Sequence, residues 1–144
     1  MLLFVYEGIT CPDGWTVFRN NCFRVFNLQK TWAEAELACQ DIDGHLAIIR
    51  DEEEEDAVRA LVKYDWSWIG LRYQSQKGSF IWVDGSNASY VNWLPGQPYV
   101  NDDYSSNDYS SIYDDHCVHI SDLEDGWYDQ SCTYSIEYIC EISY

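Results

Sequence analysis

The six cysteines of this chain limit its fold more than any other feature of the sequence. They are Cys11, Cys22, Cys39, Cys117, Cys132 and Cys140. An even number of widely spaced cysteines without a C-x-x-C pair argues against a zinc knuckle or a thioredoxin-type redox motif. Six buried thiols in a cytosolic protein are the alternative to three disulfides in an oxidising compartment, and we favour the disulfides. The count alone leaves the pairing open.

The charge of the chain excludes two classes of partner. Its 144 residues, the length of one domain, include 25 acidic and only 8 basic side chains, a net charge of -17. Such a chain repels phosphate backbones and anionic lipid headgroups, so we expect no nucleic-acid binding and no membrane-surface binding. No stretch is long enough to cross a bilayer, which argues against direct membrane insertion of this domain.

The first ten residues lack the basic region, the long apolar run and the cleavage site of a signal peptide. We therefore expect an initiator Met placed before a mature domain or fragment. The domain would be secreted or lie on the extracellular face of a membrane protein, and a membrane-anchored parent stays open.

The first third of the chain predicts a hairpin and two helices. Residues 15–26 are rich in aromatic and β-branched side chains and are interrupted at Asn20 and Asn21, which is typical of a hairpin. The Thr31-to-Glu34 spacing of a capping box predicts a helix that ends near Gln40. A second helix is predicted to open at Asp51, with Val58, Leu61 and Val62 on one side.

The second half predicts strands around a long polar segment. Strand-length apolar runs occur at 66–71, 80–83, 117–120 and 138–142. Residues 84–116 are polar and rich in Tyr, and an ordered loop of that length is normally functional. Helices followed by strands indicate an α+β domain.

The acidic run from Asp51 to Asp56 allows two interpretations. Its carboxylates could form a metal site, or they could gather at a helix N-terminus because the helix dipole favours negative charge there. We favour the second interpretation, a solvated helix start.

An ordered set of motifs resembles the C-type lectin-like domain family, in its long form. The motifs are Trp68-Ile69-Gly70-Leu71, Phe80 to Gly85, Asn92-Trp93, Gly96-Gln97-Pro98, Cys117-Val118 and Trp127-Tyr128-Asp129. The resemblance implies a fold of two helices with antiparallel sheets and a long polar loop region, over residues 11–144. Residues 1–10 would be an N-terminal extension or first strand. The implied disulfides are Cys11–Cys22, Cys39–Cys140 and Cys117–Cys132, and Trp68, Ile69 and Leu71 would be core residues.

The resemblance also implies where calcium would bind in a sugar-binding member. Gln97, Asp115 and Asp129 stand at ligand positions and carry the oxygen atoms that calcium prefers. Tyr99 and Tyr128 stand where Asp or Asn would be expected, and a neutral phenol is a poor calcium ligand. We therefore expect the calcium-bridged sugar site to be partly degraded. Rearranged calcium binding by the acids of the loop, which are Asp102, Asp103, Asp108, Asp114 and Asp115, stays an alternative.

The composition of the long loop indicates a recognition surface. Of the seventeen residues 99–115, fifteen are Tyr, Ser, Asp or Asn. Antibody binding loops use similar residues, because Tyr supplies rigid amphipathic area and Ser and Asn supply adaptable hydrogen bonds. The predicted ligand contacts are Gln97, Tyr99, Tyr104, Tyr109 and Tyr128. A solvent-exposed insertion without a specific partner is the alternative.

Nothing in the sequence assembles the groups of a catalyst. His116 and His119 could form a zinc site with Asp114 and Asp115, but no nucleophile elbow or phosphate loop is present, so we expect a binding module and not an enzyme. Asn87-Ala88-Ser89 is a sequon, which predicts glycosylation of Asn87 on the surface.

The sequence therefore predicts an extracellular module that binds a glycan or glycoprotein through its long loop, with calcium as an uncertain cofactor. The chief alternative is a calcium-independent, protein-binding receptor domain without sugar binding. A structural role in an acidic mineral- or ice-associated protein is a third hypothesis.

Overall fold

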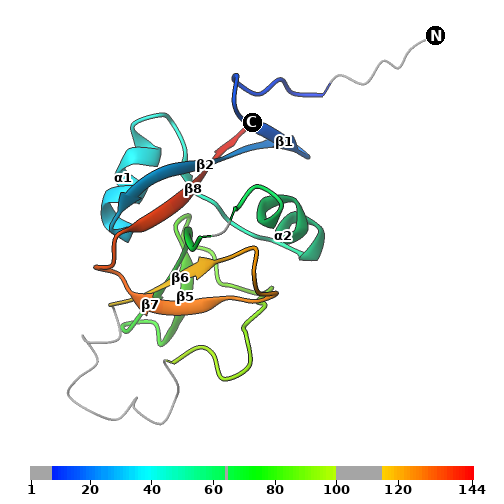
Figure 1. Cartoon of the computed structure of the whole chain (residues 1–144). Helices are drawn as coiled ribbons and strands as arrows, with labels where there is room; N and C mark the ends of the chain where they lie inside the picture. The colour runs from blue at the N-terminus through cyan, green and yellow to red at the C-terminus, as the bar shows by residue number, and fades with distance from the viewer. Residues whose placement is uncertain (1–7, 64, 100–114) are drawn as a thin grey trace.

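Two helices and eight strands make up the part of the chain that the computed structural model describes, residues 8–63, 65–99 and 115–144 (Figure 1). In chain order they are β1 (Thr16–Phe18), β2 (Asn21–Lys30), α1 (Trp32–Gln40), β3 (His45–Leu46), α2 (Glu52–Arg59), β4 (Ser67–Gln74), β5 (Ser79–Trp82), β6 (His116–Ile120), β7 (Tyr128–Ser131) and β8 (Ile136–Ser143). The predicted α+β class is confirmed. Over these ranges, neither helix is long and apolar enough to cross a bilayer.

Both helices begin at the predicted capping residues. Thr31 caps α1 in a capping box: its Oγ1 accepts from the Glu34 amide, and the Glu34 carboxylate accepts from the Thr31 amide. Asp51 caps α2 and accepts a hydrogen bond of 2.9 Å from the Glu54 amide. α2 ends at Arg59, earlier than predicted, so Leu61 and Val62 lie in the turn that follows it.

The strands form one sheet of mostly antiparallel pairs. Its order is β1-β2-β8-β4-β6-β7, with β3 beside β8 and β5 beside β4. Among the ten elements named above, β4 and β8 are the one parallel strand pair, over a short overlap at Ser67 and Trp68. In Figure 1, β1, β2 and β8 lie at one end of the molecule and β5, β6 and β7 at the other, with α1 and α2 flanking the β2–β8 pair. The two ends therefore present separate surfaces.

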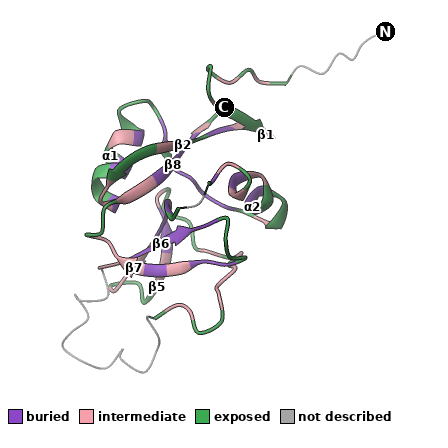
Figure 2. Ribbon diagram, in the orientation of Figure 1, coloured by how far each residue is buried: buried purple, intermediate pink, exposed green. Residues whose placement is uncertain are grey.

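The Trp-Ile-Gly-Leu motif on β4 contributes to the hydrophobic core, as predicted. Trp68, Ile69 and Leu71 are fully buried, and Figure 2 shows buried residues on the helices and also on β6 and β7. A Cβ atom on Gly70 would lie 2.8 Å from the Leu46 carbonyl oxygen, so this strand position requires glycine.

The three disulfides pair as the family resemblance implies. Cys11–Cys22 closes the N-terminal hairpin, Cys39–Cys140 joins α1 to β8, and Cys117–Cys132 joins β6 to the residue after β7. Cys39 and Cys140 are both fully buried.

The interpretation of the acidic run as a solvated helix start is wrong for two of its residues. Glu54 and Glu55 are buried, with 0% and 2% of their surface exposed. Glu54 pairs with Arg50 at 3.0 Å, and Arg50 also pairs with the buried Glu141 of β8 at 2.8 Å. The Arg50 side chain therefore links Glu54 of α2 to Glu141 of β8 and attaches the helix to the sheet.

Candidate functional site

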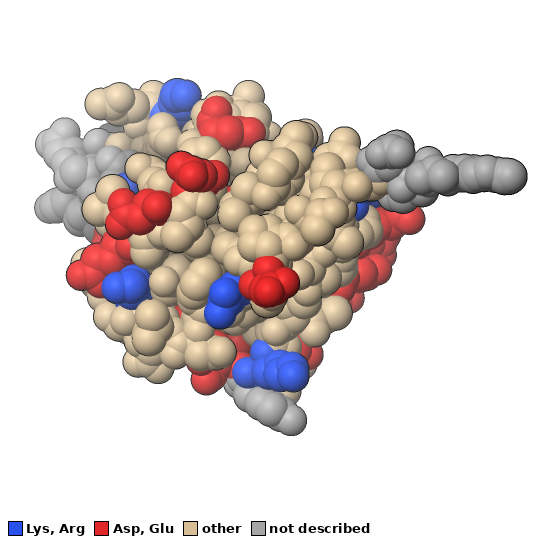
Figure 3. Space-filling view, turned by 90° about the horizontal axis from the view of Figure 1, so that it is seen from above, with Lys and Arg blue, Asp and Glu red and all other residues tan. Residues whose placement is uncertain are grey.

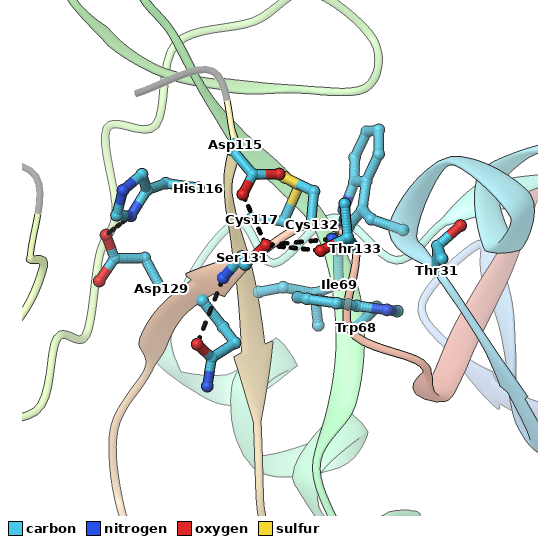
Figure 4. Close-up of a disulfide and its surroundings, with 12 residues drawn as sticks. Thr31, Trp68, Ile69, Asp115, His116, Cys117, Asp129, Ser131, Cys132 and Thr133 are labelled. Atoms are coloured by element: carbon cyan, nitrogen blue, oxygen red, sulfur yellow. Dashed lines mark hydrogen bonds and ion pairs between the residues drawn. A yellow bond between two sulfur atoms is a disulfide. The ribbon is translucent and has the colours of Figure 1, made fainter. Parts of the chain in front are cut away.

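The hairpin of β6 and β7 carries two of the predicted ligand positions, Tyr128 and Asp129, and Asp115 directly precedes it. The two strands pair antiparallel with His116 opposite Ser131 and Val118 opposite Asp129. The Cys117–Cys132 disulfide closes this end of the hairpin, and the Cys132 amide donates to the Asp115 carbonyl at 3.0 Å. The bridge therefore fixes the backbone at both Asp115 and Asp129 (Figure 4).

Asp129 is the centre of the hydrogen-bond network at this hairpin. Its side chain is fully buried, its Oδ1 accepts from the Tyr99 amide at 2.7 Å, and its Oδ2 lies 2.8 Å from His116 Nδ1. The Asp129 amide donates to Gln97 Oε1 at 3.3 Å. The structure therefore brings together three of the predicted site residues, Gln97, Tyr99 and Asp129, and adds His116 to them.

The segment before Tyr99 is held against the strand end by backbone hydrogen bonds. The Trp127 amide donates to the Asn92 carbonyl at 2.7 Å, and the Leu94 amide donates to the Trp127 carbonyl at 3.1 Å. A Cβ atom on Gly126 would lie 2.5 Å from Leu94 Cγ, so this close approach depends on glycine. The position of Gln97 is thus set by contacts outside the long loop.

Glu55 of α2 also holds this segment in place through hydrogen bonds. Its buried carboxylate accepts hydrogen bonds from the Tyr90 hydroxyl at 2.5 Å, Asn92 Nδ2 at 2.8 Å and Trp127 Nε1 at 3.1 Å, and also from Arg59. Burial and the Glu55 carboxylate raise the pKa of Tyr90, so its hydroxyl stays a donor. One side chain therefore joins the helix to both segments that carry the site.

Aromatic rings form the surface beside Asp129. The Tyr128 ring stacks on His119 with centroids 5.5 Å apart, Trp66 stacks on His119 at 4.7 Å, and the Trp66 and Tyr128 centroids are 6.4 Å apart. The Tyr128 hydroxyl donates to Glu124 at 3.0 Å, which raises the pKa of Tyr128. Tyr99 is 62% exposed and Trp66 is 41% exposed, so the site presents aromatic area to solvent.

The buried side chain of His119 should make the free energy of unfolding depend on pH. It is 1% exposed, neither ring nitrogen has a hydrogen-bond partner among the described residues, and burial lowers its pKa to about 4. As the pH falls, the unfolded chain, in which histidine has a pKa of about 6.5, takes up a proton at His119 before the folded protein does. Stability should therefore fall as the pH drops from about 6.5 to about 4, by about 3 kcal/mol for this group.

The measurement is urea unfolding of the wild type and of His119→Phe between pH 7 and pH 4. Phe keeps the aromatic stack but cannot take up a proton, so the variant should lose less stability over this range. Equal losses in the two proteins would contradict the assignment.

The carboxylates near the described site do not gather into one metal-binding cluster. Both oxygens of Asp129 are engaged by donors, and the Asp115 carboxylate accepts from Ser131 Oγ at 2.5 Å, turned away from Asp129 (Figure 4). Within residues 8–63, 65–99 and 115–144, no group of three His, Cys, Asp or Glu side chains could hold a metal ion. A calcium ion at Asp129 would have to share the carboxylate oxygens with the Tyr99 amide and the His116 ring.

Several predicted residues cannot be placed in this arrangement. Tyr104 and Tyr109 lie outside the described residues, as do the loop acids that are Asp102, Asp103, Asp108 and Asp114. Asn87 is exposed in the turn after β5, and its glycosylation stays a prediction. His116 and His119 are three residues apart on β6, so their side chains leave opposite faces of the strand.

Sequence reasoning missed the roles of His116 and Glu55. The sequence suggests His116 only as a zinc ligand, because no spacing rule relates it to Asp129 on another strand. A signal for Glu55 was present: Glu54 and Glu55 precede the buried Val58 by four and three residues, which puts all three on one helix face.

Comparison with known proteins agrees with this architecture. The family model of the Lectin C-type domain matches residues 28–142. The chain is 36% identical over 147 residues to the alpha-N-acetylgalactosamine-specific lectin of Patiria pectinifera, covering 92% of this chain and 83% of that lectin. It is 44% identical over 89 residues to the human low affinity immunoglobulin epsilon Fc receptor, of which the match spans only 28%.

The fold is also similar to a solved structure. The crystal structure of a calcium-independent type II antifreeze protein superimposes with a TM-score of 0.79 and 29% identity, over 96% of this chain and 98% of that one. The family model, the sequence relatives and this superposition agree with one another. The chain therefore belongs to the C-type lectin domain family.

Proposed function

We propose that this domain is an extracellular recognition module that binds glycans of glycoproteins without calcium, at the surface formed by Gln97, Tyr99 and Tyr128. The observation that carries the proposal is the engagement of the Asp129 carboxylate by the Tyr99 amide and the His116 ring. A buried carboxylate needs partners that compensate its negative charge. At Asp129 these partners are protein donors, so no bound cation is needed for that purpose. The three disulfides support an extracellular location.

The chemistry of the surface suits a sugar. A sugar ring has an apolar face that packs on an aromatic side chain, and Tyr99 and Tyr128 offer such rings. Gln97 uses its Oε1 on the Asp129 amide, and its Nε2 has no hydrogen-bond partner among the described residues, so it is available to a hydroxyl. Tyr104 and Tyr109 are proposed as further contacts. The name of the Patiria pectinifera lectin supports glycan as the ligand class.

Removing the aromatic ring at Tyr128 should weaken glycan binding. We expect Tyr128→Ala to bind about tenfold more weakly because a stacked aromatic contact is lost. Tyr128→Phe should bind nearly as well as the wild type, since it keeps the ring. The measurement is titration calorimetry with the glycan that binds best on an array.

Tyr144→Ala is the matched control for these variants. Tyr144 is an exposed tyrosine at the opposite end of the molecule, near β1. Wild-type affinity in both Tyr128→Ala and Tyr144→Ala would contradict the proposed surface.

A further inference from the structure

A groove of about 440 Å³ lies at the end of the molecule remote from Asp129. Its walls come from β1, β2 and the turn after α2, and include Gly14, Thr16, Phe23, Val25, Leu61 and Lys63. We call it the β2-edge groove. The face of the molecule seen from above carries separate basic groups as well as acidic ones around a broad uncharged area (Figure 3).

The groove runs along an unpaired strand edge. β1 pairs with β2 only as far as Phe23, which is opposite Thr16. Beyond Phe23, residues 24–26 of β2 pair with β8 alone among the described strands, and Asn27 lies at a shift in that register. An unpaired edge presents backbone donors and acceptors to any extended segment that can align with it. The backbone of the groove is therefore suited to an added strand.

Two basic side chains stand at the groove without an acidic partner. Neither Arg24 nor Lys63 makes an ion pair with any described carboxylate, whereas Arg19, Arg50 and Arg59 all do. The chain has 25 acidic residues against 8 basic ones, so two unpaired cations at one groove form a local reversal of the overall charge. The occupant that complements this groove is anionic.

Both cations line the same groove. The Arg24 guanidinium lies 4.9 Å from the Phe26 ring centroid on one face of β2. Val25 and Leu61, which also line the groove, pack against the core, and Lys63 follows α2 in the chain. Alternate side chains of an added strand point to the same face, so acidic residues two positions apart can meet Arg24 and Lys63 within the groove.

We propose that the β2 edge from Arg24 to Asn27 binds an extended acidic peptide of a partner protein as an added strand. The backbone of the peptide pairs with β2, and its carboxylates pair with Arg24 and Lys63. This site is separate from the glycan surface, so one domain holds two ligands at opposite ends.

The test is fluorescence anisotropy with a labelled seven-residue peptide of alternating Glu and Val, read at low salt. We expect binding that falls at least tenfold in Arg24→Glu and in Lys63→Glu. Lys77→Glu makes the same charge change in the exposed turn before β5 and should leave binding unchanged. Equal loss in all three variants would overturn the proposal, since it would show only a response to net charge.

Two further peptides separate strand addition from charge attraction. A peptide of the same sequence with alternate backbone amides methylated should not bind, because it cannot pair with the β2 edge. Undiminished binding of the methylated peptide, or tighter binding of a sulfated oligosaccharide at the same groove, would also overturn the proposal. Glycan binding at the Tyr128 surface should be unchanged in Arg24→Glu and Lys63→Glu, which keeps the two proposals distinguishable.

Discussion

Replacing Glu55 with Ala should reduce the free energy of unfolding by about 3–5 kcal/mol, as expected when one partner of a buried ion pair is removed. The Glu55 carboxylate accepts hydrogen bonds from Tyr90, Asn92, Trp127 and Arg59. Without it, these donors lose their shared acceptor, and the indole of the fully buried Trp127 keeps no described partner. The measurement is urea unfolding at neutral pH with the disulfides intact.

Glu53→Ala is the matched control for Glu55→Ala. Glu53 is on the same helix, but its side chain is 82% exposed and it pairs only with Arg19 at the surface. Such a pair contributes at most about 1 kcal/mol. If the two variants lost similar amounts of stability, Glu55 would not be the support for the site that we infer.

The loss of the Cys39–Cys140 disulfide should have a comparable effect. This bridge closes a loop of 101 residues, and the loop-entropy model gives about 4.7 kcal/mol for a loop of that size. Both cysteines are fully buried between α1 and β8, so the double variant Cys39→Ala/Cys140→Ala also loses contacts in the core. We expect a large fall in the urea midpoint.

The Cys11–Cys22 bridge provides the comparison. It spans only 11 residues near the N-terminal hairpin, so Cys11→Ala/Cys22→Ala should cost less, about 3 kcal/mol or below. A larger loss from the short bridge than from the long one would contradict the loop-entropy account.

The parts of the fold that depend on local chemistry were predicted well from the sequence. The capping residues Thr31 and Asp51 start both helices, and the apolar run at Trp68 forms the buried strand β4. Local hydrogen bonds and side-chain periodicity decide these features within a few residues. The disulfide pairing came from the family resemblance, because sequence spacing leaves it open.

The parts that depend on partners distant in the chain were not predicted. β7 has the polar sequence Tyr-Asp-Gln-Ser and becomes a strand only through its pairing with β6. In the same way, Glu55 is buried by segments more than thirty residues later, and Asp129 meets a histidine from another strand. Composition and periodicity do not describe such contacts, so the acidic run was given a surface role that Glu54 and Glu55 do not have.

The most direct test of the account is a glycan array run in calcium and repeated in EDTA. If protein donors hold Asp129 as the structure has it, the same glycans should bind in both buffers with similar strength. Binding that disappears in EDTA would contradict metal-free recognition and would show that Gln97, Asp115 or Asp129 ligates calcium in a rearranged site. Absence of binding in both buffers would contradict glycan recognition and favour a protein ligand.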